Sequence, residues 1–406
     1  MSKSSSRASR TMERLRQLAE IGRVDGLQGT TRPGLGRREQ RACELVAAWM
    51  AEADLEVGWD AHGNLFGGLA GTQPKAGEVW SGSHLDTVPD GGSFDGALGV
   101  LCGLEAVVAN GRRPATQRVV VFRDEEGWRF GNGCFGSRAV CGRLADGELE
   151  ARDAGGVSVA AALAALAIEP GGSPAGLPAS YVEVHIEQGP ELERQGVALG
   201  EVIAIAGMAG FAIEFAGEPG HAGTVPMSGR RDALIAAAEF VLRTRAAALS
   251  IPQAVSTVGN LRIADPAANV IPGRVSLTLD LRAPAAEALA SLADDVPAIA
   301  AAAAAEAGCA EVVETTWRLP PEPMSDRVRT AIRDAATATG HPIAALPSGG
   351  GHDAGILAAA GVEAGMLFVR SRNNGASHRP DELTDEADVA AAIDVLAATL
   401  ERLSMG

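Results

Sequence analysis

Apolar runs that end in polar segments recur along the first half of the chain. EVWSGSHLD reads as a strand that runs into a loop, RVVVFRDEEG as a strand ending in acids, and YVEVHIEQG as a third strand with a polar end. Residues 37–57 and the segment ALGVLCGLEAVVAN have helical character. Alternating strands and helices predict an α/β sheet, and ligands bind such sheets beyond the carboxyl ends of the strands. We therefore expect a site where these three strands end.

The middle of the chain has a different order of elements. Strand-like FAIEFAGEPG, a helix at about 229–249, strands AVSTVGNLRI and VSLTLDLR, a helix at about 285–307 and the strand AEVVETTWRL follow one another. This order suits a compact α+β domain with an antiparallel sheet. A helix at about 325–339, SGGGHDAGILAAAG, the strand GMLFVR and a last helix then return to the first pattern. The sequence predicts an α/β domain of residues 12–211 and 328–406, with a central mixed sheet flanked by helices, interrupted by a smaller α+β domain of residues 212–327.

The composition of the chain limits the classes of binding partner and the cellular compartment that we expect. The 406 residues carry a net charge of −16 without a basic run, so nucleic acid and anionic membranes are poor partners. We see no apolar segment of the ~18 residues that a membrane span needs. The polar start MSKSSSRASR is unlike a secretory signal and predicts a disordered tail, with a transit peptide as the weaker alternative. Five cysteines, an odd number without paired metal-type spacing, favour reduced thiols in the cytoplasm.

Candidate metal ligands lie in the stretch SHLDTVPDGGSFDG, directly after the first of these strands. Histidine combined with carboxylate suits Zn²⁺, Mn²⁺, Co²⁺ or Ni²⁺. His84 can offer a ring nitrogen to a metal, and Asp86 can hold the other ring nitrogen. Asp95 follows a bendable loop and could bridge two metals through its two oxygens. The alternative is a capping and turn segment, because Asp and Gly are ordinary turn residues.

Further candidates lie at the ends of the other two strands and near the C-terminus. In DEEG, adjacent side chains point in different directions, so Glu126 can bind a metal while Glu125 acts as general base on a water. A solvated acidic turn is the alternative for that motif. HIEQG adds His185 and SHRPDE adds His378, although a single loop histidine is more often a surface residue. Convergence of three strand ends on one sheet edge favours a shared site.

Taken together, the motifs resemble the amidase/carbamoylase branch of the M20 metallopeptidase-like family. The resemblance extends from about residue 12 to 403 and rests on these segments in this order: GSHLDTVPDGGSFDGALGV, EEGWRFGNGCFGSRA, HIEQGPELE, GHAGTVPM, RRDAL, NVIPG, LDLR, SGGGHDA and SHRPDE. The branch includes N-carbamoyl-L-amino-acid hydrolases, β-ureidopropionases and allantoate amidohydrolases. It differs from the peptidases of the wider family by the histidine of HIEQG, where those usually carry an acid.

The resemblance implies roles for individual residues. Two divalent ions per subunit, Zn²⁺ or Mn²⁺ with Co²⁺ or Ni²⁺ possible, would be held by two ligand sets: His84, Asp95 and His185, and Asp95, Glu126 and His378. Glu125 would be the general base and Asp86 would orient His84. The inserted domain would serve as a lid and dimerisation domain in a homodimer, with His221 reaching the partner subunit's site to stabilise an oxyanion. Gln188, Asn269 and Arg282 would bind the substrate. Arg282 could instead form a strand-end salt bridge, and His221 could be a plain loop residue.

The function that we expect is hydrolysis of a C–N bond in an N-carbamoyl amino acid or allantoate-like substrate that carries a carboxylate. An aminoacylase or dipeptidase would need the same metals, and a catalytically dead binding protein could keep the fold. The chain departs from the family at Trp128, where a small residue is usual, and at Arg370, where proline is common. Either Arg370 or Arg372 could meet an extra acidic group of a substrate. His352 and Asp353 resemble a pair that lies behind the ligands.

Overall fold

The computed structural model describes residues 3–73, 76–168 and 171–405. The chain forms two compact units. Unit 1 contains the residues up to Ile203, Pro323–Leu346 and those from His352 onward, and unit 2 contains Ala204–Glu322 and Pro347–Gly351. Residues 212 and 327, where the sequence placed the borders of an insert, lie within β7 (Gly207–Ala216) and α9 (Asp326–Thr339).

A mixed sheet forms the centre of unit 1, and its strands run in the order β1-β2-β4-β3-β5-β15-β6-β13, with β14 also paired to β6. The neighbours β4, β3, β5 and β15 are parallel to one another, while β1, β2 and β6 pair antiparallel. The strands are β1 (Glu56–Trp59), β2 (Leu65–Leu69), β3 (Glu78–His84), β4 (Thr116–Phe122), β5 (Ser180–Ile186), β6 (Leu199–Ile205), β13 (Glu322–Pro323), β14 (Ile343–Ser348) and β15 (Glu363–Val369). The predicted α/β class with a mixed central sheet is confirmed.

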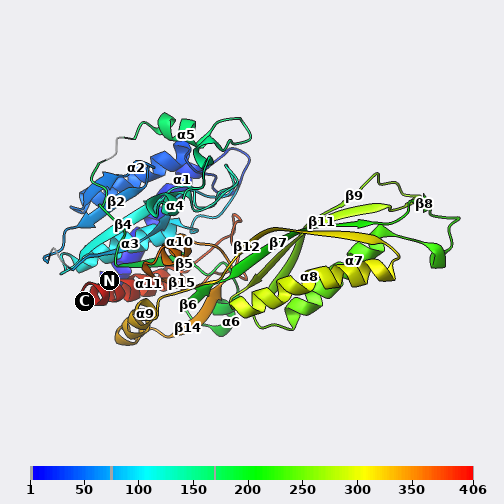
Figure 1. The fold of residues 1–406 in the computed structure, drawn as a ribbon. Helices are drawn as coiled ribbons and strands as arrows, with labels where there is room; N and C mark the ends of the chain where they lie inside the picture. Colours follow the sequence, from blue (N-terminus) through cyan, green and yellow to red (C-terminus); the bar gives the residue numbers. More distant parts are fainter. Residues whose placement is uncertain (1–2, 74–75, 169–170, 406) are drawn as a thin grey trace. The chain divides into compact units, whose positions relative to one another are not determined.

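Helices cover this sheet, and the central strands are buried along their length. Strand β5 is buried at every position, as expected of a parallel strand with helices on both faces. Helix α11 packs against α1, α3 and α9, and these helices are visible around the sheet in Figure 1. The helices of unit 1 are α1 (Lys3–Gly22), α2 (Arg37–Glu52), α3 (Ala97–Asn110), α4 (Phe135–Val140), α5 (Val159–Leu166), α6 (Glu191–Gln195), α9, α10 (Asp353–Ala359) and α11 (Glu386–Ser404).

The prediction of a disordered N-terminal tail was wrong for the part of it that the structure describes, because α1 begins at Lys3. Leu15 and Leu18 of α1 are buried in the core. Arg10 donates two hydrogen bonds to the buried carboxylate of Glu105 in α3, the one from Nε to Oε1 measuring 2.7 Å. These contacts join segments far apart in the sequence, so local composition did not reveal them.

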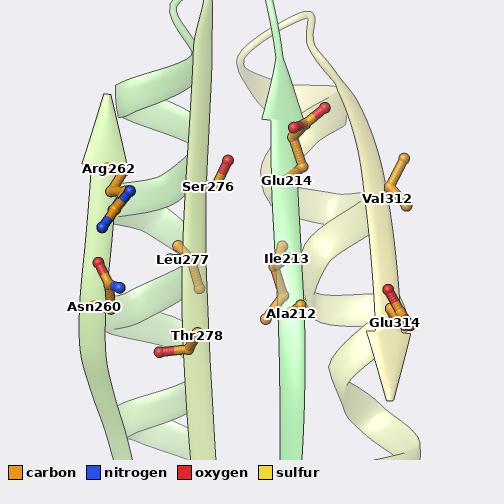
Figure 2. Close-up of a pocket in the computed structure, with 10 residues that line it drawn as sticks. All are labelled: Ala212, Ile213, Glu214, Asn260, Arg262, Ser276, Leu277, Thr278, Val312 and Glu314. Carbon is orange, nitrogen blue, oxygen red and sulfur yellow. The ribbon is translucent and has the colours of Figure 1, made fainter. Parts of the chain in front are cut away.

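Unit 2 has an antiparallel sheet in the order β12-β7-β11-β9, with α7 and α8 on one face (Figure 1). Alternate residues of β11, such as Val275, Leu277 and Leu279, are buried on the helix side, as the two-residue period of a strand requires. The elements are β7, β8 (Gly220–His221), α7 (Ala233–Leu249), β9 (Val255–Ile263), β10 (Val270–Ile271), β11 (Arg274–Ala283), α8 (Ala286–Glu306) and β12 (Ala310–Leu319). Figure 2 shows the opposite face of the four strands, where Arg262 and Glu214 border a hollow of about 390 Å³.

Helix α8 corrects one expectation from the sequence. Its 21 residues are long and apolar enough to meet the length and composition criteria for a membrane span, the one helix among the described residues that does so. Core helices also meet those criteria, and Leu289, Leu292 and Val296 of α8 pack into the core of unit 2. The buried face of α8 therefore belongs to the core of unit 2.

Candidate active site

The carboxyl ends of the parallel strands in unit 1 bring the predicted polar motifs to one edge of the sheet. His84 is the last residue of β3 and lies opposite Phe122, the last residue of β4. His185, next to the end of β5, lies opposite Phe368 of β15. The DEEG motif begins at Asp124, two residues after the end of β4. Such an edge is where ligands bind in α/β proteins, as the sequence indicated.

One group of possible ligands contains His84, Asp95 and His185, all buried, with their ligand atoms within 4.8 Å of one another. The Asp95 Oδ1 lies 3.1 Å from the His185 Nε2 and 3.5 Å from the His84 Nε2. The Nδ1 atoms contact main-chain carbonyls, that of Asp86 at 3.1 Å and that of Ile186 at 3.0 Å. Since a carbonyl oxygen only accepts, each Nδ1 carries a proton, and Nε2 is the ring atom that can face a metal.

A second group contains Asp95, Glu126 and His378 and meets the same distance criterion. The Nε2 of His378 lies 3.4 Å from the Oδ2 of Asp95 and 3.4 Å from the Oε2 of Glu126. The two groups therefore share Asp95 and use different oxygens of its carboxylate. The other oxygen of Glu126, Oε1, is buried and has no hydrogen-bond partner among the described residues. An unpartnered buried carboxylate oxygen is costly unless a cation compensates it.

The electrostatics of this edge also fit bound cations. Burial lowers the pKa of His84, but the carboxylates of Glu125, Asp86 and Asp95 more than offset this and hold it well above its usual range. Burial, together with Asp95, raises the pKa of Glu126 to about 7. The cluster thus concentrates negatively charged carboxylates. Without bound cations, protons on the imidazole rings would have to balance that charge. Divalent ions can supply that positive charge, and histidine–carboxylate donors match Zn²⁺ and Mn²⁺.

Asp86 and Glu125 lie directly beside these groups. The Asp86 carboxylate accepts hydrogen bonds of 3.1 Å from the backbone N–H groups of Glu125 and Glu126. It also lies 3.4 Å from the Nδ1 of His84. Glu125 places its Oε2 3.7 Å from the Nε2 of His84. Burial first, with nearby carboxylates, raises the pKa of Glu125 well above its usual range. Its place beside the candidate ligands suits a carboxylate that takes up a proton and releases it again.

Gln188, expected to bind substrate, contacts the shared aspartate. Its Nε2 donates a 2.9 Å hydrogen bond to the Oδ2 of Asp95 and lies 3.1 Å from the hydroxyl of Ser377. Ser377 donates to the same Asp95 oxygen at 3.2 Å. The Oδ2 of Asp95 is therefore held by two side chains in addition to its proximity to His378.

Sequence reasoning gave no role to Glu382, although it lies in the same SHRPDE motif as His378. The Oε2 of Glu382 accepts hydrogen bonds from the backbone N–H groups of Phe94 and Asp95, at 2.7 and 2.9 Å. Its position four residues after His378 was the available signal. The C-terminal segment thus contributes both a candidate ligand and the anchor of the loop that carries Asp95.

A buried polar layer lies behind His185. The ring of His352 lies 4.5 Å from that of His185, between centroids. Glu183 accepts a 2.7 Å hydrogen bond from the Ser83 hydroxyl and a 2.9 Å bond from the backbone N–H of Ala354. Glu183, His185 and His352 also each place a possible ligand atom within 4.8 Å of the others. The expected position of His352 behind the ligands agrees with its ring contact.

Three of the predicted site residues belong to unit 2. His221, in β8, is exposed, and its Nδ1 accepts a 3.0 Å hydrogen bond from the backbone N–H of Gly223, so the neutral ring carries its proton on Nε2. Asn269 lies beside it, since its carbonyl accepts from the N–H of Ala222 at 2.9 Å. Arg282 lies in β11 opposite Met208 of β7, whereas β8 pairs with β10 in a separate two-stranded sheet.

Arg282 forms the strand-end salt bridge that was its alternative reading. Its Nε and Nη2 donate to the two oxygens of Asp280 at 3.0 and 3.2 Å, and its Nη1 donates to the carbonyl of Gly349 at 2.7 Å. These bonds use three of the five N–H donors of a guanidinium, so two remain for another group. Arg282 and Asp280 border a hollow of about 620 Å³.

Arg370 and Arg372, which the sequence offered as extra substrate contacts, are paired within unit 1. Arg370 donates to both oxygens of Asp388, at 2.8 and 3.0 Å. Arg372 donates from Nε to Asp385 at 2.9 Å. Both arginines thus connect the loop that carries His378 to α11 and its start.

Comparison with known proteins agrees with this architecture. The family described as Peptidase family M20/M25/M40 matches residues 73–402. An N-carbamoyl-L-amino acid amidohydrolase of Geobacillus stearothermophilus is 40% identical over 406 residues, which cover 98% of both chains. An allantoate amidohydrolase of Bacillus subtilis is 33% identical over 397 residues, 95% of each chain. The crystal structure of a hydantoinase/carbamoylase family amidase from Burkholderia multivorans matches with a TM-score of 0.93 and 31% identity, over 98% of both chains.

These matches extend over nearly the whole chain and agree with the motifs from which the resemblance was first inferred. The chain belongs to peptidase family M20/M25/M40, in its amidase/carbamoylase branch.

Proposed function

We propose that the protein is a metal-dependent amidohydrolase that cleaves the C–N bond of an N-carbamoyl amino acid or allantoate-like substrate. It is a hydrolase of carbon–nitrogen bonds other than peptide bonds. Relatives named N-carbamoyl-L-amino acid amidohydrolase and allantoate amidohydrolase support this activity. The observation that carries the proposal is the pair of histidine–carboxylate groups that share Asp95.

Two divalent ions would be held by these groups, one by His84, Asp95 and His185, the other by Asp95, Glu126 and His378. When bound, such ions lower the pKa of a coordinated water and polarise the substrate carbonyl. Zn²⁺ or Mn²⁺ fits the donors best, with Co²⁺ or Ni²⁺ as alternatives. Gln188 and Ser377 hold the shared carboxylate, so its two oxygens keep their separate orientations.

Glu125 acts as the general base that takes a proton from the attacking water and passes it to the leaving nitrogen. Its Oε2 lies 3.7 Å from the Nε2 of His84, so the carboxylate lies beside the first ligand group, where it can take up the proton and then deliver it. Asp86 positions Glu125 by accepting a hydrogen bond from its backbone N–H. The Asp86 carboxylate also lies close to His84. Asp86 therefore orients the base and a metal ligand together.

The residues of unit 2 would bind the substrate and stabilise charge on its carbonyl oxygen. The Nε2–H of His221 can donate to a developing oxyanion. Arg282 has two N–H donors left for a substrate carboxylate, and Asn269 and Gln188 can add polar contacts. We propose that unit 2 is a lid and dimerisation domain of a cytoplasmic homodimer, in which His221 reaches the partner subunit's site.

A substrate panel tests the proposed function. Protein treated with a chelator is assayed metal-free and after addition of Zn²⁺, Mn²⁺, Co²⁺ or Ni²⁺, with N-carbamoyl amino acids, allantoate, N-acyl amino acids and dipeptides, by amine and ammonia release. We expect hydrolysis of a carbamoyl substrate or allantoate only after metal addition. Full activity in verified metal-free protein would refute metal dependence. A preference for acyl or peptidyl substrates would identify the protein as an aminoacylase or dipeptidase. Bound metal without turnover of any substrate would identify it as a binding protein.

Glu125→Gln tests the base. We expect an unchanged metal content, measured by mass spectrometry, and a loss of kcat of at least ~10²-fold, the usual scale for removal of a general base. Glu150→Gln, an exposed glutamate of the short helix Glu148–Glu150, is the matched control and should keep the wild-type rate. An unchanged rate in Glu125→Gln would remove this residue from its role.

A further inference from the structure

Trp128 holds an exposed aromatic ring in a fixed place on unit 1. It retains 40% of its surface in contact with solvent. Its indole N–H donates a 2.8 Å hydrogen bond to the carbonyl of Thr87. Because that N–H is the only polar atom of the side chain, the exposed part of Trp128 is apolar ring surface.

The loop that carries Trp128 is fixed on both sides of the ring. Gly127 adopts a φ of +63°, which favours glycine, and its carbonyl accepts a 2.7 Å hydrogen bond from the N–H of Gly131. Arg129 donates to the carbonyls of Gly34 and Leu35, at 2.8 Å each. The ring therefore projects from an ordered backbone instead of a free loop.

Short contacts connect this ring to the candidate catalytic groups. Trp128 follows Glu126 by two residues, and its anchor Thr87 directly follows Asp86 in the chain. Asp86 in turn accepts from the N–H groups of Glu125 and Glu126. Trp128 is thus tied to the two segments that supply the base and the ligands. An apolar surface at that place is suited to contact an apolar part of a molecule held by those groups.

We propose that Trp128 is a specificity-determining residue that contacts the side chain of the substrate. This inference rests on the proposed function and names its substrate class: N-carbamoyl amino acids with a large apolar or aromatic side chain. N-carbamoylglycine has no side chain to cover the ring, and allantoate offers a second polar ureido group in its place. Both are therefore poorer substrates, since desolvating apolar surface favours only an apolar partner.

The test compares kcat/KM for N-carbamoyl-L-phenylalanine, N-carbamoyl-L-leucine, N-carbamoylglycine and allantoate in metal-reconstituted protein. We expect the wild type to prefer the phenylalanine derivative over the glycine derivative by at least ~10-fold, the lower range for apolar discrimination in a pocket. Trp128→Ala should reduce that ratio by about tenfold or more, while kcat/KM for N-carbamoylglycine stays within about threefold. If Trp128 had a purely structural role, Trp128→Ala would lower kcat/KM for all substrates by the same factor. That result would overturn the inference.

Two further variants keep the test decisive if Trp128→Ala folds poorly. Trp128→Phe keeps an aromatic ring without the hydrogen bond to Thr87, and we expect it to retain most of the preference. Val108→Ala removes similarly exposed apolar surface from α3, about 20 Å along the chain direction from Asp95, and should leave the ratio unchanged. The inference is contradicted if the ratio of kcat/KM for the phenylalanine derivative to that for the glycine derivative stays the same in Trp128→Ala. It is also contradicted if Trp128→Phe loses the preference for the phenylalanine derivative. Absence of hydrolysis of every carbamoyl substrate and of allantoate contradicts the proposed function instead.

Discussion

The ion pair between Glu39 and Arg123 offers a direct test of how the candidate site is supported. Both side chains are fully buried, and the Nη2 of Arg123 lies 2.7 Å from the Oε2 of Glu39. The Glu39 carboxylate also accepts from the backbone N–H groups of Leu35, at 2.7 Å, and Asp124, at 3.2 Å. Arg123 and Asp124 form the segment between β4 and Glu125, so this pair holds the backbone that leads to the proposed base.

We expect Glu39→Gln to destabilise the protein strongly. The amide keeps the shape and one acceptor oxygen but removes the charge, so the guanidinium of Arg123 stays buried without its partner. Removing one member of a buried pair costs about 3–5 kcal/mol, because the remaining charge is no longer compensated. The surface pair of Arg113 and Glu401, 2.9 Å apart, leaves Glu401 49% exposed, and Glu401→Gln should cost only ~0–1 kcal/mol.

Chemical denaturation at fixed metal concentration measures both effects as shifts of the unfolding midpoint. The double variant Glu39→Gln, Arg123→Met removes both charges and should recover much of the loss, which isolates the interaction from other consequences of each substitution. If Glu39→Gln shifts the midpoint no more than Glu401→Gln does, the pair does not support this segment in the way that its burial indicates.

Three other outcomes follow from the same contacts. Asp95→Asn should lower the content of both metals by mass spectrometry, whereas His378→Ala should lower only one; equal losses would argue against a shared aspartate. A Cβ at Gly99 would lie 2.1 Å from a backbone oxygen of β5, whereas one at Gly103 would come no closer than 3.3 Å to any atom, the nearest atoms belonging to Ser81. Gly99→Ala should therefore lower the melting temperature strongly and Gly103→Ala slightly, and equal shifts would contradict this packing. Burial raises the pKa of Cys43 to about 12, so about one thiol in ten thousand is ionised at pH 8, and labelling there should require unfolding; rapid labelling of the native protein would refute this.

The elements that could be predicted from the sequence are those with a strong local pattern. The apolar runs of β3, β4 and β5 end in a histidine or are followed by an acid within two residues, and the parallel pairing of the strands places those ends together. Period and length alone therefore indicated both the α/β class and the edge where the site should lie. Helices α7 and α8 were expected to within a few residues for the same reason.

Features that depend on contacts between distant segments could not be predicted in this way. Helix α1 has a polar start, and its burial depends on α3 and α11. Glu39 lies in an ordinary amphipathic helix, and only the structure shows that it pairs with Arg123. The bonds from Glu382 to the loop of Asp95 connect residues nearly 290 positions apart. No local period carries information about such pairings.

The contacts of Asp95 connect distant segments of the discontinuous unit 1 at the proposed site. Its backbone N–H is held by Glu382, and its Oδ2 by Gln188 and Ser377, so the first and last segments of unit 1 jointly set its carboxylate. A carboxylate whose two oxygens face different groups must be fixed in rotation, because a partial turn about its last bond would direct both oxygens away from those groups. The C-terminal segment supplies that restraint together with His378. The first ligand group can therefore form near the ends of β3 and β5, but the second is complete only once the segment of residues 377–382 has packed against the loop of Asp95.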